Sequence, residues 1–266
     1  MTMPTRIALA LSVISLLLGS MACAQSFDAV RLQRTAPGQD LGVVGLAVLS
    51  APMYAGSEER RTRALPLVDY QWANDWFAGV SNGVGVNLSS DPNLQYGLRV
   101  TADLGRKERR SQALRGMGDI QAKAEAGAFF NLAWPGGWQA TTSLRHGSGA
   151  GGKGLVADAG LGYGAALAPQ WRVGASVGLS AVNSHAMRST FGVDEAQSSR
   201  SGYSVYRPGS GLRDVRAGAS LTYALDPRNA VMAAASFNRL LDHAADSPLT
   251  RQRNTASALL VYTYAF

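Results

Sequence analysis

Apolar and polar side chains alternate with a period of two residues along most of this chain. In the stretch 119–132, every even position holds Ile, Ala, Phe or Leu, whereas most odd positions hold charged, amide or glycine residues. The stretches 94–104, 171–183 and 214–225 repeat the pattern. Because successive side chains of a β-strand point to opposite faces, the sequence predicts a sheet with one apolar and one mainly polar face.

The length and the charge of these stretches indicate which kind of sheet they form. The alternation holds for 10 to 14 residues at a time, whereas strands of soluble proteins average about 5–6 residues and tilted membrane-spanning strands need about 9–11. A soluble sandwich remains the alternative, but an open sheet edge in lipid is costly, so a membrane sheet must close. In a closed barrel the lumen-facing charges would be Arg99, Lys123, Glu125, Asp158, Arg172 and Arg216.

Aromatic residues at the segment ends favour the membrane barrel. All five tryptophans lie beside predicted turns, where a girdle at headgroup level needs them, although turn-flanking core aromatics would give the same pattern. The chain ends on a strand with four large apolar side chains on one face: Leu260, Tyr262, Tyr264 and Phe266. This ending resembles the insertion signal of bacterial outer-membrane barrels.

The fold class predicted is therefore all-β, a closed antiparallel transmembrane β-barrel. Eleven segments can be marked: 41–50, 65–73, 76–88, 94–104, 119–132, 138–146, 154–168, 171–183, 211–225, 229–241 and 254–266. Single-chain bacterial barrels normally have an even number of strands, so we expect about 12, with 10 as the alternative and the missing strand near the N-terminus. If Phe266 is periplasmic, the short turns face the periplasm and the long connections lie outside.

The N-terminal sequence indicates a leader, and the composition excludes some classes of protein. The 266 residues include 46% apolar and 16% charged residues, 30 glycines and one cysteine, with a formal net charge of +7. Residues 1–24 read as a signal peptide cleaved after Ala24, with acylation of Cys23 as the alternative. Residues 25–40 would then form a short periplasmic segment and residues 41–266 the barrel. A single cysteine excludes a disulfide scaffold.

No candidate for catalysis, a cofactor or a metal emerges. The glycine-rich stretch 147–154 nearly fits a phosphate-binding loop but lacks the final Ser or Thr and the following helix. Ser148 and His146 are a poorly held pair on a glycine loop. Two basic stretches, 60–63 and 106–115, are not expected to meet nucleic acid in an exported protein. The second could neutralise lipopolysaccharide phosphates or could simply be a solvated loop face.

A family resemblance appears in the N-terminal third, in the segment 41–49 followed by the motif residues Pro52, Tyr54, Gly56, Ser57, Leu65 and Pro66. Further matches are Gly105-Arg106, 114–120, Glu125, Phe191-Gly192-Val193 and Ser247-Pro248-Leu249. Together they resemble the MltA-interacting protein (MipA/OmpV) family over essentially the whole mature chain.

The resemblance implies an outer-membrane barrel surrounded by lipid and lipopolysaccharide, without enzymatic activity. Some members are described as scaffolds that join a lytic transglycosylase to a peptidoglycan synthase, and that role is the one expected here. The alternatives are a small-solute channel and an adhesin that acts through residues 184–210. The inward charges either pair and block the lumen, which we expect, or line a narrow water path.

Overall fold

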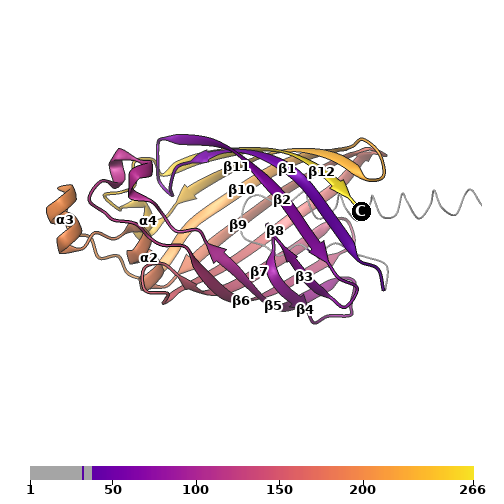
Figure 1. Cartoon of the computed structure of the whole chain (residues 1–266), viewed down its shortest axis with the longest axis horizontal. Coiled ribbons are helices and arrows are strands. Elements are labelled where there is room, and N and C mark those ends of the chain that lie inside the picture. The colour runs from indigo at the N-terminus through magenta and orange to yellow at the C-terminus, as the bar shows by residue number, and fades with distance from the viewer. Residues whose placement is uncertain (1–31, 33–37) are drawn as a thin grey trace, which may run out of the picture.

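Twelve antiparallel strands close into a barrel in the computed structural model, which describes Leu32 and residues 38–266 (Figure 1). The strands are β1 (Leu41–Pro52), β2 (Arg60–Gln71), β3 (Trp76–Gly79), β4 (Gly83–Asn87), β5 (Leu94–Asp103), β6 (Lys123–Trp134), β7 (Trp138–Ser148), β8 (Gly154–Ala168), β9 (Trp171–Val182), β10 (Gly211–Ala224), β11 (Asn229–Leu240) and β12 (Asn254–Ala265). Each pairs with its sequence neighbours, and β1 pairs with β12 to close the sheet. The predicted fold class and the strand number of 12 are confirmed.

One segment predicted as a single strand is in fact two strands, and this accounts for the twelfth strand that the sequence analysis did not locate. The segment 76–88 is two short strands, β3 and β4, joined by a tight turn in which Gly83 has a φ of +79°. The Asp69 carboxylate on β2 stabilises this turn by accepting hydrogen bonds from the backbone N–H and the hydroxyl of Ser81. Asn82-Gly83 is a strong hairpin signal that the alternation of the flanking residues conceals.

A second difference lies at the start of β6. The segment 119–122 alternates like a strand, but β6 begins only at Lys123. Asp119 instead accepts hydrogen bonds from the Lys107 ammonium and the Glu108 backbone N–H, which holds these residues in the preceding loop. Local side-chain hydrogen bonds thus keep residues 119–122 out of β6, although their sequence alternates like that of a strand. The other strand ends differ from the prediction by a few residues.

The two faces of the wall differ as the alternation requires. Large apolar side chains on the outer surface are exposed, as at Leu46, Leu98 and Leu260, whereas neighbouring positions on the inner face are polar or small. On β12 and just beyond it, Leu260, Tyr262 and Phe266 are exposed, and the Phe266 ring stacks on that of Tyr264. An apolar exterior of this kind buries its area only against lipid.

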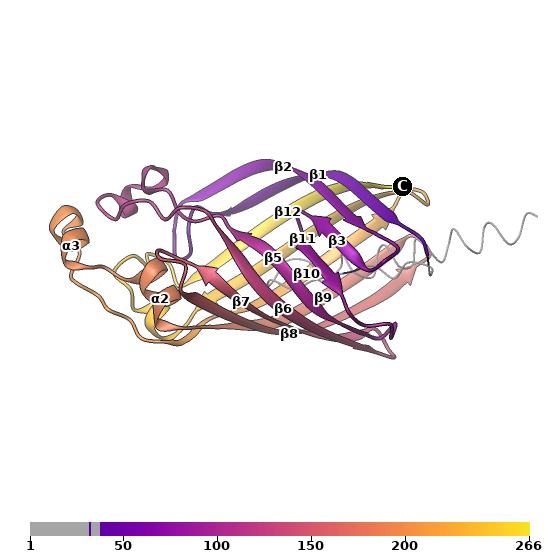
Figure 2. The same ribbon diagram turned by 60° about the horizontal axis from the view of Figure 1, so that its bottom comes forward.

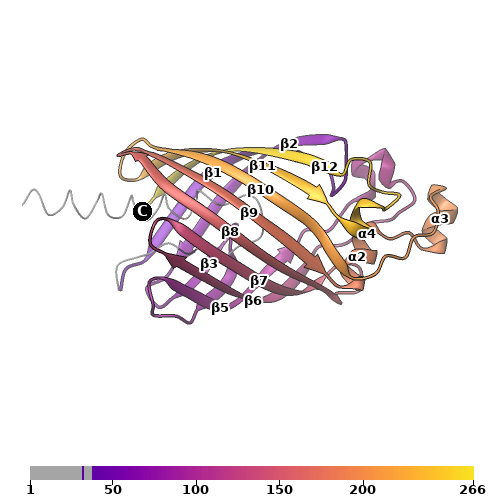
Figure 3. The ribbon, with the colours of Figure 1, turned by 180° about the vertical axis from the view of Figure 1, so that it is seen from behind.

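The two ends of the barrel are built differently (Figure 3). At the end that carries Phe266, called the turn end, strands connect through short turns such as 135–137 and 169–170. The opposite loop end carries longer connections with short helices: η1 (Glu108–Arg110), η2 (Gln112–Leu114), α2 (Ser184–Phe191), α3 (Glu195–Ser201) and α4 (Asp242–Ala245). In the described part of the chain, no helix has the length and hydropathy needed to cross a membrane.

The expected signal peptide 1–24, its cleavage at Ala24 and most of the segment 25–40 lie outside the described residues. Leu32 is the exception: it is 6% exposed and packs against Phe77 of β3 and Phe129 of β6. Both rings point into the barrel, so a residue that precedes the first strand lies inside the lumen.

Candidate functional site: the barrel lumen

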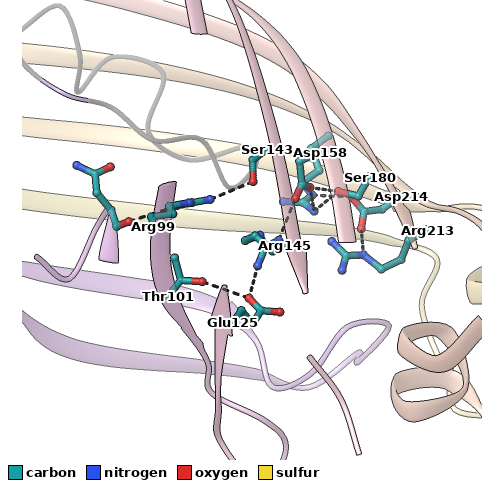
Figure 4. A network of polar contacts seen from close by, with 11 residues as sticks. Arg99, Thr101, Glu125, Ser143, Arg145, Asp158, Ser180, Arg213 and Asp214 are labelled. Atoms are coloured by element: carbon teal, nitrogen blue, oxygen red, sulfur yellow. Dashed lines mark hydrogen bonds and ion pairs between the residues drawn. The ribbon is translucent and has the colours of Figure 1, made fainter. Parts of the chain in front are cut away.

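Charged side chains from adjacent strands form a connected network on the inner wall (Figure 4). Its centre is Arg145 on β7, which binds Glu125 on β6 at 2.6 Å and Asp158 on β8 at 2.9 Å. Both carboxylates are almost fully buried. Charges in such a setting need direct partners, and one guanidinium supplies them for two carboxylates.

The network continues across β9 and β10. The Asp158 carboxylate accepts a hydrogen bond from the Ser180 hydroxyl, which in turn accepts one from Arg216 at 2.7 Å. Asp214 binds Arg213 and Arg216, each at 2.6 Å. Arg213 sits at a register shift between β9 and β10 that interrupts the alternation, and this irregularity places two consecutive charged residues against one another.

Beside this network, further polar contacts reach the short hairpin. Arg99 on β5 donates to the Ser143 hydroxyl at 3.0 Å and to the backbone carbonyl of Asn82 at 3.3 Å. Thr101 donates to Glu125. The polar contacts therefore cross the strands from β5 to β10 and also fix the β3–β4 turn.

The structure places all six expected lumen charges on the inner wall. Glu125, Asp158 and Arg216 take part in this network, and Arg99 contacts Ser143 beside it. Lys123 and Arg172 lie apart from it. Arg145 was not identified in the sequence analysis. Thr141, Ser143 and Arg145 are successive inward positions of β7, two residues apart, so the alternation could have placed Arg145 in the lumen.

An apolar cluster lies on the opposite part of the inner wall. Ala47, Met232 and Val261 form a buried cluster across β1, β11 and β12, with Leu259 packed against it. The apolar contact of Leu32 lies elsewhere in the lumen, against Phe77 of β3 and Phe129 of β6. The interior thus has a charged side on β5–β10, whereas the described inner face of β11, β12 and β1 carries apolar and small polar residues, such as Val261 and Thr263, and no charged residue.

The loops at the loop end pack into an outer cap, defined here as 53–59, 104–122, 183–210 and 241–253. One apolar cluster joins α2 and α4 to the barrel through Met187, Phe191, Leu240 and Ala244. A second brings together Met117, Val193 and Leu249 from three different loops. Beneath α2 lies a cavity of about 250 Å³ whose lining includes Glu125, Arg145, Ser148, Val182, Ala186 and Arg213.

The motif residues 52–57 fasten the first loop to this cap. The Tyr54 hydroxyl donates to the carbonyl of Leu249 at 3.0 Å, and burial raises the pKa of Tyr54 to about 12, so the donor proton is retained. Gly56 has a φ of +90°, and its carbonyl accepts from the backbone N–H groups of Arg251 and Gln252. Pro52 ends β1, and the Ser57 hydroxyl is buried against Glu59.

Other segments that carry the family resemblance also meet in the cap. Arg106 is buried and donates to the carbonyl of Thr190 at 2.8 Å, and Ser247 donates to the carbonyl of Phe191 at 2.6 Å. Lys107 pairs with Asp119. The first two residues of the basic stretch 106–115 are therefore used within the cap, which leaves the exposed Arg109 and Arg115 to face outward.

The two chemical motifs considered from the sequence are not assembled into a site in the part of the chain that the structure describes. No group of His, Cys, Asp and Glu side chains among the described residues could hold a metal ion. A register shift follows His146, which leaves His146 exposed while Ser148 is buried. The glycine stretch 147–154 leads from one strand directly into the next, without the helix that a phosphate-binding loop requires.

Comparisons with known proteins place the chain in context. The family model described as "MltA-interacting protein MipA" matches residues 44–266. The KdgM porin is similar in structure at 7% sequence identity and a TM-score of 0.47, over 84% of this chain and 99% of that one. The COG4313 outer membrane channel from Pseudomonas putida F1 is similar at 10% sequence identity and a TM-score of 0.45, over 88% of this chain and 97% of that one. No curated protein matches the sequence.

Proposed function

This chain belongs to the MltA-interacting protein MipA family, and from that premise we propose that it is a non-enzymatic scaffold that holds peptidoglycan-remodelling enzymes at the outer membrane. The observation that carries the proposal is the family match over residues 44–266, whose description names an interaction with MltA, a lytic transglycosylase. A peptidoglycan synthase is the second partner in this proposal.

The turn end is the surface proposed to meet these enzymes. Outer-membrane barrels usually have short turns on the periplasmic side and longer loops outside. Turns of two or three residues between long paired strands, as at 135–137 and 169–170, form a rim that loses little conformational entropy when a partner docks. The apolar belt would hold that rim at a constant depth in the membrane.

The lumen supports a scaffold better than a channel. Six charged residues on β6, β7, β8 and β10 are paired with one another, Leu32 lies inside the barrel, and the cap packs over the loop end. Paired charges have few free donors or acceptors with which to replace the hydration shell of a passing ion.

Binding to a purified lytic transglycosylase of the MltA type is the first test. We expect the chain in lipid nanodiscs to capture the enzyme, and a ten-residue Gly/Ser insertion at one or more of the turns 135–137, 169–170 and 226–228 to weaken capture at least about tenfold by displacing the docked surface. Biolayer interferometry would measure the dissociation constants.

The matched control places the same insertion in the loop 149–153, at the opposite end of the barrel, and should leave capture unchanged. Absence of binding to the intact chain, or weakening only by the control insertion, would contradict the proposed docking end or the scaffold itself.

Electrical recording gives a separate prediction. In a planar bilayer the intact chain should pass no steady ion current, because the paired charges offer few free groups to a passing ion and the cap packs over the loop end. An open porin recorded under the same conditions serves as the positive control. Reproducible unitary currents from the intact chain would favour a channel instead.

A further inference from the structure

The barrel wall is incomplete on one side of its loop-end half (Figure 2). β3 and β4 have only 4 and 5 residues, whereas their neighbours β2 and β5 have 12 and 10. The pairing of β2 with β3 stops at Asp69, and that of β5 with β4 stops at Val100. No described strand therefore pairs with β2 over 60–67 or with β5 over 101–103 on the facing sides; we call this region the lateral notch.

The backbone groups of β2 that face the lateral notch can be identified from their alternation. Val68 accepts a hydrogen bond from the N–H of Val80, and Trp72 donates to Trp76, so the even-numbered residues of β2 point their backbone groups away from β1. Thr62 and Ala64 are on the same side, and no described strand pairs with them there. Open strand edges are costly in lipid, where no water satisfies them.

Pro66 occupies the next even position, and it has no N–H to leave unsatisfied. Proline is found in sheets mainly at such edges. The donors on this edge are thus confined to its upper part, at Arg60, Thr62 and Ala64, nearest the cap. Lower down, the notch is bordered by Pro66 and by the exposed side chain of Val80, so the edge is polar near the loop end and apolar toward the middle of the membrane.

Two inward-facing arginines stand beside the polar part. Arg61 and Arg63 pair in register with Ala51 and Leu49, which are on the inner face of β1. No ion pair joins either guanidinium to another residue in the described part of the chain, and the buried Nε of Arg63 has no hydrogen-bond partner. Arg60, in contrast, is held by Ser50 and Ala256. Two cations that have no ion pair in the described chain, beside N–H donors that no described strand meets, favour an anion.

Inward side chains at the notch are also unusually accessible. Leu65 is 37% exposed, whereas Ala47, its register partner on the inner face of β1, is 7% exposed. An apolar side chain that faces inward should be covered, as it is elsewhere on this wall. The notch therefore offers apolar surface that is continuous with the membrane-facing belt.

We propose that the lateral notch binds a phosphate-bearing lipid from the surrounding leaflet. Its phosphate takes the N–H groups of Thr62 and Ala64 and the guanidinium groups of Arg61 and Arg63, and one acyl chain lies along Pro66, Leu65 and Val80. The order of polar and apolar groups along β2 matches a lipid whose headgroup is at the loop end. This site is independent of the scaffold role, because it lies at the opposite end of the barrel from the proposed docking surface.

The test uses the purified chain in detergent and measures binding by native mass spectrometry. The probes are dimyristoyl phosphatidic acid, dimyristoylglycerol with the same chains but no phosphate, and inorganic phosphate. We expect phosphatidic acid to bind at least about tenfold more tightly than either of the others. The double variant R61Q/R63Q should lose at least tenfold in affinity for phosphatidic acid.

The matched control is R207Q/R253Q, which removes the same charge from exposed positions of the cap outside the basic stretch 106–115 and should change binding less than twofold. Equal binding of inorganic phosphate and phosphatidic acid would indicate an ion site and overturn the lipid assignment. Equal loss in both double variants, or no loss in R61Q/R63Q, would also overturn it.

Access from the membrane can be measured separately. A bimane label on L65C should be quenched by lipids with brominated acyl chains at least several-fold more than the same label on A234C, which faces inward behind a complete wall. Equal quenching at both positions would show that the notch is closed to lipid.

Discussion

Replacing Arg145 by methionine should destabilise the barrel by on the order of 3–5 kcal/mol. Arg145 is the only described side chain that forms an ion pair with Glu125, and it also pairs with Asp158. Its removal takes this cation away from two carboxylates that are almost fully buried on the inner wall. Urea unfolding in lipid vesicles, followed by tryptophan fluorescence and by the heat-dependent shift on unboiled gels, would measure the loss.

The loss of stability should come from leaving Glu125 and Asp158 without their cation, and not from removing an inward arginine in general. Arg172→Met removes an inward arginine that has no ion pair among residues 38–266, and it should cost less than about 1 kcal/mol. The triple variant E125Q/R145M/D158N removes the stranded charges and should recover more than half of the loss. An R145M barrel as stable as the original would mean that water in the lumen already solvates the carboxylates.

The barrel wall could be predicted because one rule governs each of its positions. In a closed sheet the lipid and the lumen lie on opposite faces, so alternation assigned the strands and placed Glu125 and Asp158 inside. Alternation did not reveal the turn at Asn82 and Gly83, because apolar and polar residues alternate on both sides of it, and the segment 76–88 therefore reads as one strand. Reading the dipeptide before the alternation would have found both the twelfth strand and the short hairpin.

Other features depend on contacts between distant parts of the chain. Tyr54 and Leu249 are 195 residues apart, and the hydrogen bond between them involves a backbone carbonyl that no residue type marks. The charges at Arg213 and Asp214 lie at a register irregularity, where a period of two no longer assigns faces. The lateral notch, too, requires the lengths of four strands to be known at once.

The second large effect is expected in the outer cap. Phe191 is fully buried at the end of α2 and packs with Met187 and Leu240, so Phe191→Ala should weaken the docking of the cap by on the order of 3–5 kcal/mol. Because 1.4 kcal/mol is a factor of ten, transient opening should increase by at least two orders of magnitude. Limited trypsin digestion would detect this as faster cleavage at Arg200 and Arg207.

The strands do not depend on this cluster for their pairing, so the F191A barrel should keep its heat-dependent gel shift while its cap is cleaved. Val205→Ala is the matched control, since this side chain is in the same loop but is 45% exposed, and its cleavage rate should not change. Loss of the gel shift in F191A would show that cap and wall unfold as one unit. Unchanged cleavage would mean that the cluster at Phe191 does not hold the cap closed.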